Sequence, residues 1–121
     1  MASTLPEDDW ARVLRWAGGQ PAQAHFLADP GHGWRYGAPL RYAGRDVFLE
    51  EVKDTAMATY SRESAARVIE RRAAIGDFGA LDAEGARALA TRFRLDYLVI
   101  DRDMDLPLVH QEGVFRIYAL R

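Results

Sequence analysis

The sequence lacks three things: cysteine, a long apolar run, and an excess of basic residues. Without cysteine, the chain forms no disulfides and no thiolate-ligated zinc site. No stretch approaches the roughly 20 apolar residues that a membrane helix needs, and the first ten residues do not resemble a signal peptide. We therefore expect the chain as given to be soluble.

The charge is nearly balanced, with 16 Lys and Arg residues against 18 Asp and Glu residues and a formal net charge of -2. These charges are interspersed, so they leave no basic footprint for a phosphate backbone, and nucleic acid is not an expected partner. A chain of 121 residues that is 49% hydrophobic can bury a core without staples. We expect a single globular domain over residues 1–121.

A first helix is predicted by the spacing i, i+3, i+4 and i+7 of the apolar residues Trp10, Val13, Leu14 and Ala17. Thr4 and Glu7 have the spacing of a capping box at its start, with Pro6 in the first turn. Gly18-Gly19 is expected to end the helix.

Two further helices are expected in the second half of the chain. The first covers residues 54–75, with Ser61 as a cap and one face formed by Ala65, Val68, Ile69 and Arg72. The second is capped by Asp82, and its amphipathic face is Ala86, Leu89, Ala90 and Phe93.

Strands are predicted at residues 24–28, 46–51 and 97–100, followed by a terminal hairpin around Glu112 and Gly113. Residues 97–100 are continuously apolar, which is typical of an interior strand covered on both faces. The order of elements predicts an α/β protein: a small layered fold with helices packed on a mixed sheet and a C-terminal β-hairpin. The expected core is Trp10, Val13, Leu14, Phe26, Leu27, Val47, Leu49, Leu89, Phe93, Leu98, Ile100, Phe115 and Ile117.

The acidic stretch "DRDMD" places Asp101, Asp103 and Asp105 directly after an apolar strand. An Asp-x-Asp in this position is compatible with Mg²⁺ or Mn²⁺ in a transferase, and with Glu112 the spacing also matches that of a calcium loop. The calcium loop, however, needs glycine where Leu106 stands, and Pro107 follows. We favour an exposed turn and predict no metal site and no cofactor.

The histidines and serines offer weaker candidates for catalysis. His25, His32 and His110 lack the spacing of a zinc set, so structural or surface roles are expected. Asp29 and His32 could face a cleft as an acid and base, but no serine stands in a nucleophile context. Ser61 and Ser64 are better explained by helix capping. We predict no catalytic residue.

The segment 31–45 is a glycine-punctuated connection in which aromatic residues alternate with arginines. Such side chains suit stacking on sugars or clamping a phosphate, although they can also simply pack a long loop. Neither a P-loop nor a dinucleotide fingerprint is present. The candidate ligand-binding residues are Trp34, Arg35, Tyr36, Arg41 and Tyr42.

The order of four segments carries a family resemblance. They are "WARVLRWAGGQPAQAHFLADP", "WRYGAPLRYAGRDVFLEEVKD", "ARALATRFRLDYLVIDR" and "LPLVHQEGVFRIYAL". Together they resemble the soluble C-terminal extracytoplasmic domain of bacterial polytopic membrane proteins related to C-type glycosyltransferases. The resemblance covers residues 10–120 and implies a membrane-embedded parent protein, of which the chain is an excised piece or a free-standing homologue.

In that family the catalytic acidic groups lie in the membrane part, so the resemblance implies a non-catalytic accessory domain here. Its expected partners are the membrane-embedded part of the parent and an acceptor glycan. The sequence upstream is then expected to encode several hydrophobic spans of about 20 residues. The alternative is a small independent ligand-binding module or enzyme that uses the 31–45 loop and the strand ends.

Overall fold

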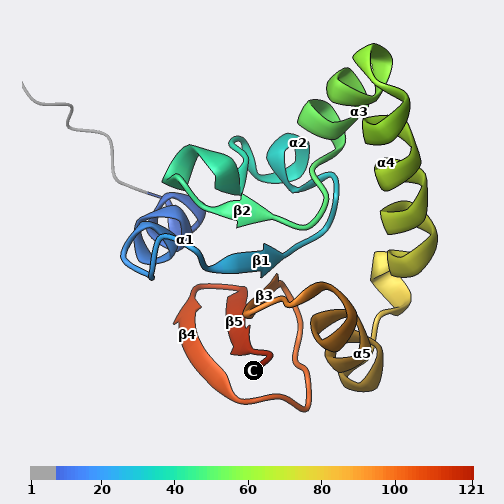
Figure 1. Ribbon diagram of the computed structural model, residues 1–121. Helices are drawn as coiled ribbons and strands as arrows, with labels where there is room; N and C mark the ends of the chain where they lie inside the picture. Colours follow the sequence, from blue (N-terminus) through green and yellow to red (C-terminus); the bar gives the residue numbers. More distant parts are fainter. Residues whose placement is uncertain (1–7) are drawn as a thin grey trace, which may run out of the picture.

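A computed structural model, which describes residues 8–121, shows an α/β protein with helices packed against a mixed five-stranded sheet (Figure 1). The fold class predicted from the sequence is confirmed. The elements are α1 (Asp9–Gly18), β1 (His25–Leu27), α2 (His32–Tyr36), η1 (Leu40–Ala43), β2 (Asp46–Val47), α3 (Glu51–Tyr60), α4 (Arg62–Ile75), η2 (Phe78–Ala80), α5 (Ala83–Phe93), β3 (Tyr97–Ile100), β4 (Leu108–Glu112) and β5 (Phe115–Ala119).

The strand order in the sheet is β2-β1-β3-β5-β4. β1 pairs in parallel with both β2 and β3, whereas β5 runs antiparallel to β3 and to β4. β4 and β5 form the predicted hairpin, and Gly113 in its turn has φ 57°, a conformation that favours glycine. The sheet therefore joins a parallel half to an antiparallel half at β3.

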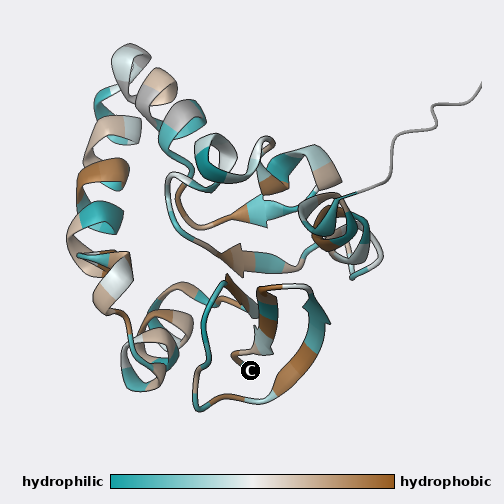
Figure 2. Ribbon diagram, turned by 180° about the vertical axis from the view of Figure 1, so that it is seen from behind, coloured by the Kyte–Doolittle hydropathy of each residue, from teal (hydrophilic) through white to brown (hydrophobic). Residues whose placement is uncertain are grey.

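Each face of the sheet has its own hydrophobic core. On one face, Leu27 and Leu98 pack with Val68 of α4 and Leu89 of α5. On the other face, the sheet residues pack against Trp10 and Val13 of α1 and against η1. Neighbouring residues of β3 enter opposite clusters, which confirms that this strand is covered on both faces. Figure 2 shows the hydrophobic stretches running along the strands of the sheet.

The predicted core is largely confirmed, since only Leu14 and Phe93 of the expected set are partly rather than fully buried. Sequence reasoning missed several fully buried side chains, among them Leu40, Phe48 and Leu95. Two of these lie in segments that the sequence pattern assigned to a loop and to a helix–strand junction. Apolar residues outside the predicted helices and strands therefore also contribute to the core.

The first helix begins later than the capping box suggests. Asp8 is the N-cap of α1, and its side chain accepts a hydrogen bond of 2.7 Å from the amide of Ala11. The proposed pair Thr4 and Glu7 lies outside the described residues. The expected end is confirmed, because Gly19 caps the carboxyl end of the helix.

The single helix predicted over residues 54–75 is in fact two helices, α3 and α4, which Figure 1 shows side by side beyond the edge of the sheet. Ser61 lies between them with extended backbone, and its side chain accepts a hydrogen bond from the amide of Ser64. A serine hydroxyl competes for backbone amides, so it ends one helix and starts the next. Val68 is buried as expected, but Ile69 is 69% exposed, so its assignment to the buried face was wrong.

The strand predicted over residues 46–51 is shorter, because only Asp46 and Val47 pair with β1. The amide of Phe48 still donates to the carbonyl oxygen of Phe26 at 2.8 Å, but Phe48 and Leu49, which are both buried, lie outside the strand, and α3 begins at Glu51. The apolar run therefore signalled burial rather than strand length. None of the helices in the described part of the chain combines the length and apolar character that a membrane crossing requires.

The segment 31–45 is not an open loop, since it contains α2 and η1. Buried His32 braces it: Nδ1 donates to the carbonyl oxygen of Asp29 at 2.8 Å, and the amide of Leu40 donates to Nε2 at 2.9 Å. These two bonds define a neutral imidazole. Gly37 and Gly44 end the two turns with left-handed backbone, φ 104° and 75°.

Candidate functional site

The carboxyl ends of the three parallel strands lie together at one end of the sheet, which we call the carboxyl edge, and an acidic residue follows each strand. Asp29 follows β1, Glu50 follows β2, and Asp101 follows β3 directly. In open α/β sheets, ligands bind beyond the carboxyl ends of the strands. This edge also receives α2 and η1, which carry the aromatic and arginine residues singled out from the sequence.

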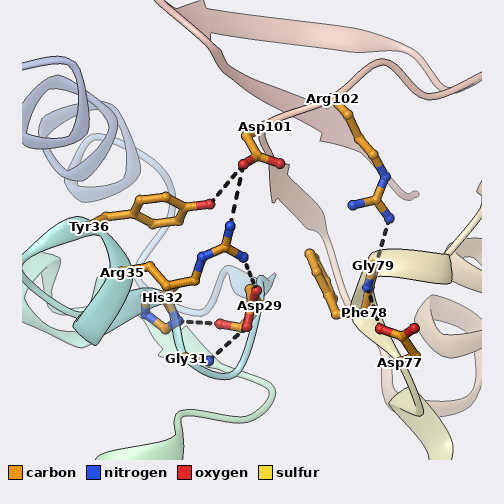
Figure 3. A network of polar contacts seen from close by, with 10 residues as sticks. All are labelled: Asp29, Gly31, His32, Arg35, Tyr36, Asp77, Phe78, Gly79, Asp101 and Arg102. Atoms are coloured by element: carbon orange, nitrogen blue, oxygen red, sulfur yellow. Dashed lines mark hydrogen bonds and ion pairs between the residues drawn. The ribbon is translucent and has the colours of Figure 1, made fainter.

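Arg35 of α2 lies between two of these carboxylates (Figure 3). Its guanidinium donates to Asp29 and lies 3.8 Å from the carboxylate of Asp101. The same oxygen of Asp101 accepts a hydrogen bond of 3.2 Å from the hydroxyl of Tyr36. The hydrogen bond to Asp29 raises the pKa of Arg35, and the cation stays paired. The network ties α2 to the ends of β1 and β3.

Tyr36 belongs as much to the core as to this edge. Its ring centroid lies 4.8 Å from those of Trp10 and Phe115, in tilted and edge-on arrangements. Burial, followed by the charge of Asp101, raises the pKa of the Tyr36 hydroxyl. The hydroxyl therefore remains a hydrogen-bond donor to Asp101, and the ring is partly buried against Trp10 and Phe115.

The possible acid–base pair of Asp29 and His32 is not present as a cleft-facing pair. His32 is completely buried, and both ring nitrogens are engaged with the backbone. Burial lowers the pKa of His32, which keeps the ring neutral. The side chain of Asp29 instead accepts from Arg35 and from the amide of Gly31. His32 therefore has a structural role.

A pocket of about 200 Å³ opens beside this network, and its walls come from α2, η1 and the end of β2. Trp34 and Tyr42 border it and remain 74% and 67% exposed. These are the most exposed aromatic side chains among those whose burial the structure describes. The lining residues are Gly33, Trp34, Gly37, Pro39, Arg41, Tyr42 and Glu50.

Charged groups at the base of this pocket are held in place. The Arg41 guanidinium donates to Oε1 of Glu50 at 2.7 Å, and it also lies 5.0 Å from the centre of the Tyr42 ring. Glu50 is only 1% exposed, and its second oxygen accepts from the amide of Lys53 at the start of α3. The pocket therefore combines two exposed aromatic faces with a rigid, charge-neutral pair of hydrogen-bonding groups.

The structure separates the sequence-predicted site residues into two groups. The pocket is lined by Trp34, Arg41 and Tyr42. By contrast, Arg35 and Tyr36 do not line it and instead contact the carboxylate of Asp101. Sequence reasoning missed Glu50, although its place just after a strand is the signal that could have identified it. It also missed the link between the aromatic segment and the acidic stretch.

The three aspartates of the acidic stretch have different partners. Asp101 faces Arg35 and Tyr36, while Asp103 forms an ion pair of 2.6 Å with Arg116. Asp105 contributes its backbone carbonyl oxygen, which accepts a hydrogen bond from the side chain of Arg87. Among the residues that the structure describes, no three His, Asp or Glu side chains are arranged to hold a metal ion.

A larger hollow of about 550 Å³ lies at the opposite edge of the sheet, near the amino ends of the parallel strands. The carboxylate of Asp96, which lines this hollow, already has two partners within the protein: it accepts a hydrogen bond from the amide of His25 and forms an ion pair with Arg121. The carboxyl edge carries the stronger candidate site, since exposed aromatic rings and oriented polar groups converge there.

Comparison with known proteins adds no assignment: family models, curated proteins and solved structures all returned no match to this chain.

Proposed function

We propose that this chain is a non-catalytic accessory domain of a bacterial membrane protein of the glycosyltransferase type, and that it contacts a glycan. The observation that carries the glycan contact is the pocket at the carboxyl edge, which is lined by the exposed rings of Trp34 and Tyr42 together with Arg41 and Glu50. The membrane parent and the extracytoplasmic location rest on the sequence resemblance.

The chemistry of this pocket suits a sugar ring. A pyranose has an apolar face of C–H groups, which packs against an aromatic face, and hydroxyls at its rim that donate and accept hydrogen bonds. Glu50 is buried and both of its oxygens already accept hydrogen bonds, so the partly exposed Arg41, which it holds in place, is the group of this pair that can donate to a sugar hydroxyl. A pocket of about 200 Å³ fits one sugar unit of a chain that continues into solvent.

The carboxylates at this edge support a binding role over hydrolysis. Glycoside hydrolysis needs two carboxyl groups that flank the bond and are free to act as acid and as base or nucleophile. Asp29 and Asp101 share the cation of Arg35, and Glu50 is buried against Arg41. These three groups are committed to holding α2 and η1 in place.

The alternative is an independent ligand-binding module or small enzyme that uses the same segment 31–45 and the strand ends. It draws on the same pocket, so binding alone does not separate the two readings. Turnover of a bound oligosaccharide would favour the enzyme, and hydrophobic spans encoded upstream would favour the accessory domain.

The binding test uses isothermal titration calorimetry, because it needs no reporter side chain and therefore measures binding by Trp34→Ala as well as by the unsubstituted protein. Neutral oligosaccharides of glucose, mannose and N-acetylglucosamine are titrated against the protein and against Trp34→Ala and Tyr42→Ala. Ile69→Ala serves as a matched control, since Ile69 is 69% exposed and lies on α4 away from the pocket.

We expect saturable binding of at least one oligosaccharide that is weakened about tenfold by Trp34→Ala or Tyr42→Ala, the loss of roughly 1.4 kcal/mol of contact energy. Ile69→Ala should bind the oligosaccharide as tightly as the unsubstituted protein does. Failure of the whole panel, or equal binding by all variants, would refute the glycan contact. Sugar release on incubation would transfer the proposal to the enzyme alternative.

A further inference from the structure

A further pocket, of about 190 Å³, lies between the amino ends of β1 and β2 and the helices α3 and α4, and it shares His25 and Asp46 with the larger hollow of about 550 Å³. Its charged lining comprises Lys53 of α3 and Arg67 and Arg71 of α4, together with His25, Asp46 and Asp54. It shares no lining residue with the aromatic pocket at the carboxyl edge. The two sites therefore pose separate questions.

Arg67 and Arg71 are four residues apart on α4, so they occupy the same face of the helix. Like charges at this spacing repel each other, and they weaken a helix by a few tenths of a kcal/mol. Burial, and then the charge of Arg67, lowers the pKa of Arg71. Asp54 and Glu70 oppose this lowering only in part, and Glu70 is also paired with Arg92.

Arg71 is fixed before any ligand arrives. One of its terminal nitrogens donates to the carbonyl oxygen of Phe48 at 2.7 Å, and its guanidinium lies 5.1 Å from the centre of the Phe48 ring. These contacts leave the other N–H groups of the guanidinium for another acceptor. A preorganised cation of this kind loses little entropy on binding an anion.

The carboxylates of the pocket offset these cations only in part. Asp54 accepts from the amide of Glu50 and lies 3.7 Å from the ammonium of Lys53, so its charge is shared. Asp46 at the start of β2 is exposed. Among the lining residues, the cations Lys53, Arg67 and Arg71 outnumber the carboxylates Asp46 and Asp54, and Glu70 outside the lining also acts on Arg71.

We propose that this pocket binds a phosphate-class oxyanion, which Arg67, Arg71 and Lys53 hold together. A phosphate monoester offers three acceptor oxygens and a charge of about −1.5 to −2, which matches two guanidinium forks and one ammonium group better than a carboxylate does. The volume of about 190 Å³ admits a phosphate group and lies below the roughly 300–1,000 Å³ of pockets for drug-sized ligands.

The titration of His25 supplies an independent signal at the same place. Burial, and then the positive charge of Arg71, lowers the pKa of His25, while Asp46 and Asp96 act in the opposite direction. An oxyanion bound beside Arg71 adds negative charge near the imidazole, so it should raise the pKa of His25. His110, which is paired with Glu112 on the hairpin, serves as the internal reference.

The test titrates inorganic phosphate against the protein at about 0.1 M NaCl, a salt concentration that screens loose attraction over about 10 Å. Amide NMR spectra locate the binding, and Arg67→Gln is compared with Arg62→Gln, which removes the same charge from an exposed position of the same helix outside the pocket. We expect saturable shifts at residues 46–54, a higher pKa for His25, and about tenfold weaker binding in Arg67→Gln only.

Absence of saturation, or equal weakening in Arg67→Gln and Arg62→Gln, would overturn the proposal, because it would mean that net charge alone attracts the ion. If Arg67→Gln fails to fold, the phosphate-dependent amide shifts and the His25 titration of the unsubstituted protein test the proposal by themselves. Trp34→Ala should leave phosphate binding unchanged, so this site and the proposed glycan contact fail independently.

A second experiment distinguishes a lipid headgroup from a soluble phosphate ester as the natural ligand. Vesicles of phosphatidylcholine with and without phosphatidic acid are tested for co-sedimentation with the protein and with Arg67→Gln. Once inorganic phosphate binds, co-sedimentation that needs both phosphatidic acid and Arg67 identifies a lipid headgroup as the ligand. No co-sedimentation identifies a soluble phosphate ester.

Discussion

Leu98→Ala tests the position of β3 at the centre of the sheet. Leu98 is completely buried, and its register partners are Leu27 of β1 and Tyr118 of β5, which belong to the same hydrophobic cluster. Truncation to alanine removes about three carbon groups, each contributing about 0.8 kcal/mol of transfer free energy. Strands on both sides and α5 above limit the collapse of the resulting cavity.

We therefore expect Leu98→Ala to lower the free energy of unfolding by about 3–5 kcal/mol, the upper part of the range for buried leucines. For a domain of this size, each kcal/mol lowers the melting temperature by roughly 3–6 °C. Urea unfolding followed by circular dichroism gives the change, and the slope against urea should stay constant if only stability changes.

The matched control is Leu108→Ala on edge strand β4, where the side chain is 51% exposed. We expect this substitution to change stability by about 0.5 kcal/mol or less. A loss below about 1 kcal/mol for Leu98→Ala, or similar losses for both variants, would refute the central position of β3.

Three further predictions concern buried charge, protonation and backbone. Arg41→Ala leaves the carboxylate of Glu50 buried without its cation, so we expect a loss of about 1–3 kcal/mol in urea unfolding, and Arg41→Lys should restore part of it. The pKa of His32 is lowered in the folded state, so the unfolded chain binds its proton first. The contribution of His32 to the free energy of unfolding should therefore be constant above pH ~6.5 and fall as the pH drops below it. The fall should be weaker in His32→Gln. A rise in stability on acidification, or an imidazole that titrates near pH ~6.5 by NMR, would contradict the neutral, buried state of this ring. Gly113→Ala places a side chain on a backbone with φ 57° and against the carboxylate of Asp9, so we expect a loss of about 1–2 kcal/mol in urea unfolding. Gly18→Ala, whose new side chain meets nothing closer than 3.5 Å, should cost less.

Local sequence signals predicted those parts of the fold that local physics determines. The continuous apolar run at 97–100, the Asp82 cap and the turn at Gly113 each act within a few residues, and each is confirmed. Ser61 was recognised as a cap, but treating it as internal to one helix concealed the break between α3 and α4. The extent of β2 depends on its pairing with β1, which periodicity does not reveal.

The candidate site was only half accessible to sequence reasoning. The aromatic and arginine composition of 31–45 identified Trp34, Arg41 and Tyr42, which border the pocket. The contact between Tyr36 and Asp101 joins residues 65 positions apart, and no local pattern contains it. Burial of His32 likewise follows from the way the segment folds back on itself, which brings the amide of Leu40 to Nε2 of the ring.

The placement of β1 between two parallel neighbours has a consequence for the order of folding. The start of β1 joins the start of β3 through a hydrogen bond from His25 to Asp96, which lie 71 positions apart. Closing a loop of about 70 residues costs on the order of 4 kcal/mol in chain entropy, whereas the β4–β5 hairpin closes through a short turn. We expect β3, β4 and β5 to assemble early and to present a free edge of β3. The amino-terminal half then docks on that edge in a slower, rate-limiting step, which leaves the aromatic pocket incomplete until the end of folding.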